Sequence, residues 1–131
     1  MESVAVWADG ASRGNPGPAA IGAVIKDEQG KLVTRISQRI GITTNNQAEY
    51  RAIIAALQEA IRLGAKQVRI SLDSQLVVRQ ISAQYRVRKA ELKPLHQQVT
   101  QLLSRLEAFT ITHIPHQQNT EAHHLANMAF K

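Results

Sequence analysis

The chain contains no cysteine, and this absence excludes several kinds of chemistry. Disulfide bonds, thiolate zinc sites and a cysteine nucleophile all require a side chain that the sequence does not have. A metal ion would therefore be bound through oxygen or through imidazole nitrogen. Any metal-dependent activity has to be sought among the carboxylates and histidines.

Aromatic residues and long apolar runs are also scarce. Phe, Trp and Tyr make up only 4% of the chain, which argues against a protein that binds single-stranded nucleic acid by stacking its bases on aromatic side chains. No apolar run approaches the roughly 18 residues of a membrane-spanning helix, and the first nine residues contain no long apolar stretch. We expect a soluble, cytoplasmic protein without a membrane partner.

The length, the apolar content and the charge suit a small basic domain. With 131 residues, 44% of them hydrophobic, the chain can bury one core, and we expect a single domain over residues 1–131 and a monomer. The 16 Lys and Arg against 10 Asp and Glu give a net charge of +6, which suits a polyanion such as nucleic acid. Basic residues gather between residues 79 and 105, where a solvated helix face is the alternative interpretation.

The spacing of apolar residues predicts nine elements in the order βββαβααβα. Short apolar or alternating runs indicate strands, and repeats of three and four residues indicate helices. The predicted strands cover residues 4–9, 20–26, 31–40, 68–73 and 109–114, and the predicted helices cover residues 46–63, 75–82, 92–106 and 118–130.

Local signals mark both ends of the first predicted helix. Thr44 and Gln47 match a capping box, in which each side chain bonds to the backbone of the other residue. Gly64 supplies a natural C-terminal stop. The helix therefore lies between the third and fourth strands.

Three acidic residues occupy unusual places in this pattern. Asp9 and Asp73 each end a predicted buried strand, immediately before a turn residue, and the carboxyl ends of strands are where ligands bind in open α/β sheets. Either aspartate alone could simply cap the turn that follows it. Glu49 lies one turn before Ile53 on the helix stripe that faces the sheet, where an unpaired carboxylate is costly to bury.

Three converging carboxylates would repel one another unless a cation neutralised them. Hard oxygen ligands select Mg²⁺ or Mn²⁺. Two such ions about 4 Å apart can activate a water and stabilise the leaving oxygen of a phosphodiester. An ion-pair network with nearby arginines is the structural alternative.

Four segments give the chain a resemblance to the ribonuclease H type 1 family across nearly its whole length. Residues 9–18 (DGASRGNPGP), 43–49 (TTNNQAE) and 72–75 (LDSQ) resemble its first three acidic motifs. Residues 85–95 are similar to short bacterial and archaeal members that lack the longer basic protrusion. The resemblance implies a mixed five-stranded sheet flanked by helices, a two-metal mechanism with Mg²⁺ or Mn²⁺, and an RNA–DNA hybrid as substrate.

The resemblance also implies roles for individual residues. Asp9 would bridge both metal ions, while Glu49 and Asp73 would hold the ion on the leaving-group side. Three amide residues, Asn15, Asn46 and Gln75, would contact the minor groove of the substrate, and Thr44 would lie near the DNA-strand phosphate. For each amide, a turn or a helix cap is the alternative role.

The fourth acidic position departs from the family pattern. Residues 119–126 (NTEAHHLA) align with a segment in which aspartate follows alanine, and His123 stands at that place. A neutral imidazole can ligate a metal, but it adds no negative charge and is softer than Mg²⁺ favours. We therefore expect weaker binding of the ion that activates water and a reduced activity.

A second histidine precedes the fourth position. His116 lies in the predicted loop after the last strand, where relatives carry a histidine or an arginine that acts in proton handling or product release. His113 is an alternative for that role, although its place in the strand pattern favours a structural one, and His124 is expected at the surface.

Three functional hypotheses follow from these patterns. The leading one is an endoribonuclease that hydrolyses the RNA strand of hybrids through three carboxylates and His123. The alternative is a weakly active or inactive module that binds hybrid or double-stranded RNA. A processing enzyme that acts on double-stranded RNA is the third.

Overall fold

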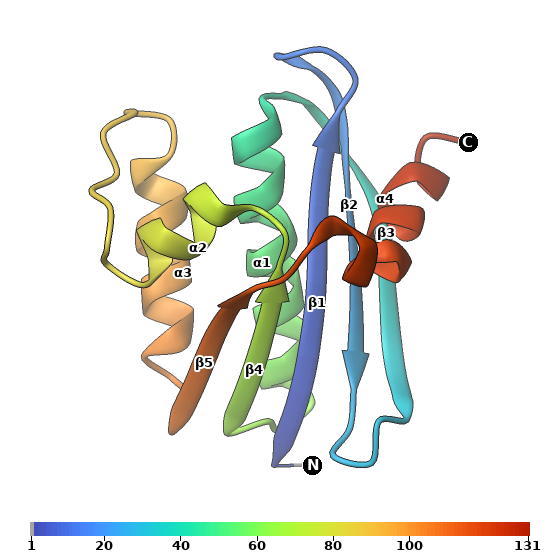
Figure 1. Ribbon diagram of the computed structural model, residues 1–131, viewed down its shortest axis with the longest axis vertical. Helices are drawn as coiled ribbons and strands as arrows, with labels where there is room; N and C mark the ends of the chain where they lie inside the picture. Colours follow the sequence, from blue (N-terminus) through green and yellow to red (C-terminus); the bar gives the residue numbers. More distant parts are fainter. Residues whose placement is uncertain (1) are drawn as a thin grey trace.

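A computed structural model of the chain describes residues 2–131 and contains all nine predicted elements. The expected order βββαβααβα is confirmed, with one short 3-10 helix, η1, added before the last helix (Figure 1). The strands are β1 (Ser3–Ser12), β2 (Gly17–Lys26), β3 (Leu32–Thr43), β4 (Gln67–Leu72) and β5 (Ala108–His113). The helices are α1 (Asn45–Arg62), α2 (Gln75–Ile81), α3 (Lys93–Leu103), η1 (His116–Gln118) and α4 (Thr120–Met128).

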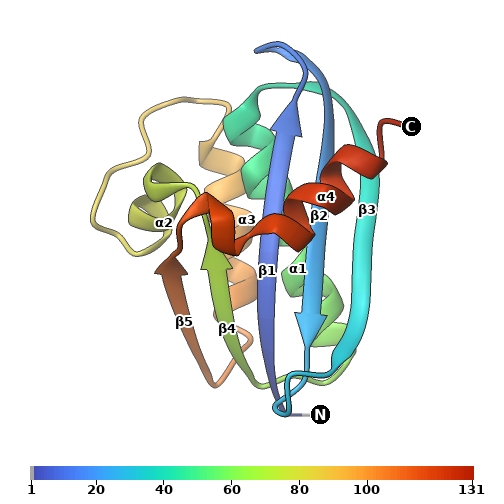
Figure 2. The same ribbon diagram turned by 45° about the vertical axis from the view of Figure 1, so that its right-hand side comes forward.

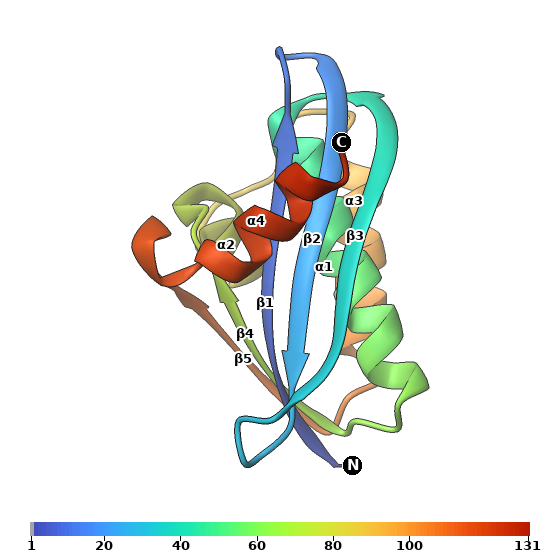
Figure 3. The same ribbon diagram turned by 90° about the vertical axis from the view of Figure 1, so that its right-hand side faces the viewer.

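The five strands form one mixed sheet in the order β3-β2-β1-β4-β5. β1, β2 and β3 are antiparallel neighbours, whereas β1, β4 and β5 run parallel. Helices α1 and α3 lie on one face of the sheet, and α4 crosses β1, β2 and β3 on the other face (Figures 2 and 3). Among residues 2–131, no helix is long and apolar enough to cross a membrane.

Helix α1 forms where the sequence predicts it. Thr44 is its N-cap, and both halves of the capping box with Gln47 are present. Ile53 and Leu57 are almost fully buried, in a core that also contains the inward residues of β1, β2 and β4. Just beyond the helix, Gly64 adopts a φ of 89°, a conformation that glycine reaches without strain.

Two glycines allow both helices to approach the central strands closely. A Cβ atom on Gly10 of β1 would lie 2.2 Å from the backbone of Ala48 in α1. A Cβ atom on Gly22 of β2 would lie 2.2 Å from the carbonyl oxygen of Ala122 in α4. The absent side chains therefore bring the start of α1 close to β1 and the start of α4 close to β2, where Gly22 pairs with Asp9.

The predicted end of the first strand is wrong by three residues. β1 continues to Ser12 because its antiparallel pairing with β2 extends to Ser12 opposite Ala19. Its parallel pairing with β4, however, stops at Trp7. Asp9 thus lies where β1 and β4 separate, and this gap in the sheet takes the place of the strand end that was expected.

The last predicted helix, residues 118–130, is also corrected. The chain instead makes η1 and then a shorter α4 that begins at Thr120. Asn119 separates the two, with a φ of −116° that is outside the helical range, and its side-chain amide donates a hydrogen bond to the carbonyl oxygen of Ala8 at 3.0 Å. This bond anchors the start of α4 to β1.

Candidate active site

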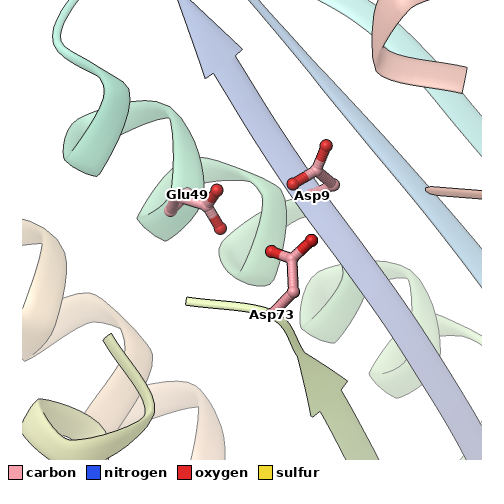
Figure 4. A group of neighbouring side chains, drawn as sticks. All are labelled: Asp9, Glu49 and Asp73. Atoms are coloured by element: carbon pink, nitrogen blue, oxygen red, sulfur yellow. The ribbon is translucent and has the colours of Figure 1, made fainter. Parts of the chain in front are cut away.

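The three acidic residues converge at the gap between β1 and β4. Asp9 comes from β1, Glu49 from the first turns of α1, and Asp73 directly follows β4, so that the three side chains point toward one another (Figure 4). One carboxylate oxygen from each lies within 4.8 Å of the others. The structure therefore brings together the three residues that the sequence singles out.

Burial makes this arrangement electrostatically costly. Asp9 and Glu49 are 4% and 5% exposed. Burial raises the pKa of Glu49 well above its usual value, and repulsion from Asp9 and Asp73 raises it further. The pKa of Asp9 is also raised, first by burial, while its hydrogen bond with His123 opposes that shift. The surroundings of the cluster therefore disfavour the ionised forms of both carboxyl groups.

The donor atoms fit a hard divalent cation. The Oε2 atom of Glu49 is buried and has no hydrogen-bond partner. A buried oxygen without a partner is unfavourable unless a bound ion or water satisfies it. Carboxylate oxygens are the ligands that Mg²⁺ and Mn²⁺ prefer. These three residues could therefore hold a metal ion.

His123 lies next to the cluster without joining its group of ligand atoms. Its Nδ1 is 3.0 Å from Oδ2 of Asp9, and its Nε2 is 3.0 Å from the side-chain nitrogen of Asn127. The group of neighbouring ligand atoms that the described residues form contains the three carboxylates alone. The fourth position thus contacts a candidate metal ligand directly.

His116 makes a parallel contact on the other side of the site. It is the first residue of η1, and its Nδ1 lies 3.1 Å from Oδ2 of Asp73. The rings of His116 and His123 meet edge to face, with centroids 4.9 Å apart. His113, the alternative, is the exposed last residue of β5, and His124 is exposed as expected.

The acidic residues and both histidines line an open cavity of about 380 Å³. Asn45 and Ser74 also line it, although the sequence pointed to their neighbours Asn46 and Gln75. The four predicted substrate-binding residues lie on elements around this cavity: Asn15 in the β1–β2 loop, Thr44 and Asn46 at the start of α1, and Gln75 at the start of α2.

Two of these predicted substrate-binding residues accept hydrogen bonds within the fold. Oδ1 of Asn15 accepts a hydrogen bond from the backbone nitrogen of Asn45 at 2.9 Å, which ties the β1–β2 loop to α1. Thr44 accepts the backbone bond of the capping box. Asn15 and Thr44 thus each satisfy a backbone N–H group at the start of α1.

Two asparagines next to the site, Asn119 and Asn127, were not predicted from the sequence. Asn119 fixes the start of α4 on β1, and Asn127 contacts the ring of His123. The signal for Asn127 was its position four residues after His123, which places both side chains on one face of a helix. No comparable spacing pointed to Asn119, whose partner is a backbone oxygen more than one hundred residues away.

Comparisons with known proteins agree with this geometry. A family profile described as "Reverse transcriptase-like" matches residues 8–129. The chain is 42% identical over 127 residues to "Bifunctional protein Rv2228c" of Mycobacterium tuberculosis, covering 96% of this chain and 35% of that protein. It is also similar to the crystal structure of RNase H1 from Halobacterium salinarum, with a TM-score of 0.95, 41% identity, and coverage of 98% and 97%.

The chain belongs to the ribonuclease H type 1 family. The predicted ribonuclease H-like fold is confirmed with it. A third similar structure, LC11-RNase H1 in complex with an RNA/DNA hybrid, has a TM-score of 0.91 and 38% identity, with coverage of 96% and 95%. The chain spans about a third of the mycobacterial relative's length.

Proposed function

We propose that the chain is an endoribonuclease that hydrolyses the RNA strand of RNA–DNA hybrids. The observation that carries this proposal is the buried cluster of three carboxylates, in which one oxygen of Glu49 has no partner. The similar protein LC11-RNase H1 was solved with an RNA/DNA hybrid, which supports the same class of substrate here. All three carboxylates are present and face one cavity, which favours catalysis over a module that only binds.

The proposed cofactor is Mg²⁺ or Mn²⁺, with two ions in the working site. Asp9 would be the shared ligand, while Glu49 and Asp73 would hold the ion on the leaving-group side. When bound, such ions activate a water and stabilise the leaving oxygen of the phosphodiester. A hard cation also supplies the neutralising charge that the buried carboxylates require.

The histidines would support this chemistry from the rim. The side chain of His116 is 60% exposed and adjoins Asp73, where it would act in proton handling or product release. His123 contacts Asp9 and would take the place of the family's fourth acid. Asn15, Thr44, Asn46 and Gln75 would contact the substrate around the cavity.

A purified sample tests the proposal directly. The protein is incubated with RNA–DNA hybrid, double-stranded RNA and double-stranded DNA, each with Mg²⁺ or with Mn²⁺. We expect metal-dependent cleavage of the RNA strand of the hybrid and no cleavage of DNA. Asp9→Asn protein, purified in parallel, controls for host nuclease.

Hybrid that binds but stays intact with either metal would contradict the proposal and favour the binding module. Cleavage of double-stranded RNA in preference to hybrid would favour the processing enzyme. A monomeric state and a cytoplasmic location stay predictions of the sequence.

A further inference from the structure

The ring of His123 is held at both nitrogens. Nδ1 faces Oδ2 of Asp9 at 3.0 Å, and Nε2 faces the side-chain nitrogen of Asn127 at 3.0 Å. Asp9 is on β1, whereas Asn127 is one helical turn after His123 on α4. The imidazole therefore bridges the helix and the acidic cluster.

The chemistry of the two partners determines where the ring carries its proton. An ionised carboxylate only accepts hydrogen bonds, so the nitrogen that faces Asp9 has to donate. An amide nitrogen only donates, so the nitrogen that faces Asn127 has to accept. Both conditions are met by the neutral imidazole with its proton on Nδ1. In this state neither nitrogen has a lone pair free for a metal ion.

Helix α4 is fixed on the sheet, so this contact does not depend on a mobile segment. Asn119 bonds the start of the helix to Ala8 of β1 at 3.0 Å. The hydroxyl of Ser37 donates to the carbonyl oxygen of Leu125 at 2.6 Å, and the guanidinium of Arg39 donates to that of Ala129 at 2.7 Å. These bonds to β1 and β3 hold the ring of His123 at a set distance from Asp9.

We propose that Asn127 is a positioning residue whose amide holds His123 in the Nδ1-protonated form, so that His123 is a hydrogen-bond donor that orients Asp9 and is not itself a metal ligand. The inference deepens the proposed function and rests on it, because orienting Asp9 matters only if that carboxylate binds a cation. Groups that orient metal ligands by hydrogen bonds are a common support of metal sites.

Nitrogen NMR of the metal-free protein tests the assignment without any turnover. The histidines are labelled with ¹⁵N, and long-range proton–nitrogen spectra at mildly alkaline pH report which ring nitrogen carries a proton. His123→Ala identifies the signal of interest. We expect a protonated Nδ1 and a bare Nε2 for His123, unchanged when Mg²⁺ is added. A proton on Nε2, or loss of the Nδ1 proton on saturation with Mg²⁺, would overturn the proposal.

Variants of Asn127 test its part in the arrangement. Asn127→Ala should let the proton distribute over both nitrogens, and Asn127→Asp should place a proton on Nε2, because a carboxylate only accepts. Asn127→Gln keeps the amide and should restore the wild-type form in part. Met128→Ala, an exposed change on the same helix, is the matched control. An unchanged proton position in both Asn127→Ala and Asn127→Asp would refute the role of Asn127.

The metal requirement supplies a second measurement. Asn127→Ala should raise the Mg²⁺ concentration for half-maximal cleavage by about 10-fold, which is the lower end of the loss in metal affinity when a residue that supports a metal ligand is removed. The rate at saturating Mg²⁺ should change less. An unchanged Mg²⁺ requirement would count against the proposal. A wild-type protein that cleaves no hybrid would remove the proposed function, while the NMR result would still decide the state of His123.

Discussion

The acidic cluster and the basic loop differ in how the fold holds them. The cluster is formed by Asp9, Glu49 and Asp73, which are buried or nearly so and come from regular elements or directly follow one. The basic loop, defined here by Arg86, Arg88 and Lys89, is exposed and lies between α2 and α3 outside any helix or strand. Within residues 2–131, none of the ion pairs involves these three cations.

The difference separates two tasks that a nuclease has to perform. A buried cluster of like charges lowers the stability of the protein unless a cation neutralises it. An exposed cation costs the fold little and remains free to contact a phosphate. The cluster should therefore set the rate of cleavage, and the loop should set the affinity for hybrid. Substitutions in the cluster and in the loop test whether rate and affinity are separate in this way.

The largest effect is expected from Asp9→Asn. Loss of the carboxylate shared by both ions should remove several kcal/mol of transition-state stabilisation, or about 10³-fold in kcat. Hybrid affinity measured in chelator should change little, because the loop is intact. Single-turnover cleavage and a binding titration measure the two quantities. Asp27→Asn, a change of the same kind in the β2–β3 turn, is the matched control. Undiminished turnover in Asp9→Asn would rule out the proposed site.

The next largest effect is expected from neutralising the basic loop. Arg86→Gln, Arg88→Gln and Lys89→Gln together should weaken hybrid binding. They should also flatten the plot of log affinity against log salt, by up to about 0.9 for each phosphate that the variant no longer neutralises. The rate at saturating hybrid should stay close to that of the wild type.

A matched control removes the same charge elsewhere. Lys31, Lys66 and Arg105 are exposed in the loops before β3, β4 and β5, at the end of the sheet opposite to the cluster (Figure 1). Replacing these three residues with Gln should leave the slope of log affinity against log salt nearly unchanged. Equal slopes in the two triple variants would mean that the loop is only a solvated surface.

The acidic half of the site could be predicted from sequence because its signals are local. Asp73 ends a predicted strand, and Glu49 interrupts an apolar stripe, so each position is unusual within its own segment. The end of β1 could not be placed, since its two edges stop pairing at different residues. That difference depends on which strands become neighbours, and no single segment contains this information.

The histidine half could be predicted only in part. Its place near the cluster followed from the family pattern, but the sequence left open whether His123 binds metal. The answer depends on the partners of both ring nitrogens, and Asp9 is over one hundred residues away along the chain. Among the amides, Asn45 lines the cavity where Asn46 was expected, because a shift of one residue turns a side chain by about 100° around a helix.

A smaller effect is expected from changes at His123, which test whether the cluster needs a fourth carboxylate. His123→Asp restores a fourth carboxylate and should lower the Mg²⁺ concentration for half-maximal activity by about 10-fold. His123→Ala removes the donor to Asp9 and should raise that concentration. Metal titrations of cleavage compare the two with the wild type. If His123→Ala and the wild type require the same Mg²⁺, the histidine has no part in the metal site.

The smallest effect concerns stability and follows from the raised pKa of Glu49. Because that pKa is higher in the folded state than in the unfolded state, its contribution to stability is fully present below the usual carboxyl pKa and is lost as pH rises through the folded pKa. In chelator at neutral pH, Glu49→Gln should therefore melt at a higher temperature than the wild type. At a pH below the usual carboxyl value of 4.5, the two should melt nearly alike.

Added Mg²⁺ should reverse the order of these melting temperatures. At about 100 times its dissociation constant, the ion stabilises the wild type by about 2.7 kcal/mol. Glu49→Gln has one carboxylate fewer in the cluster and should gain less at the same concentration. Calorimetry with chelator and with Mg²⁺ measures both differences, and Glu28→Gln, an exposed change in the β2–β3 turn, is the matched control. A lower melting temperature of Glu49→Gln in chelator at neutral pH would mean that the fold already compensates this carboxylate without a cation, and the cluster would then be an internal network of the fold.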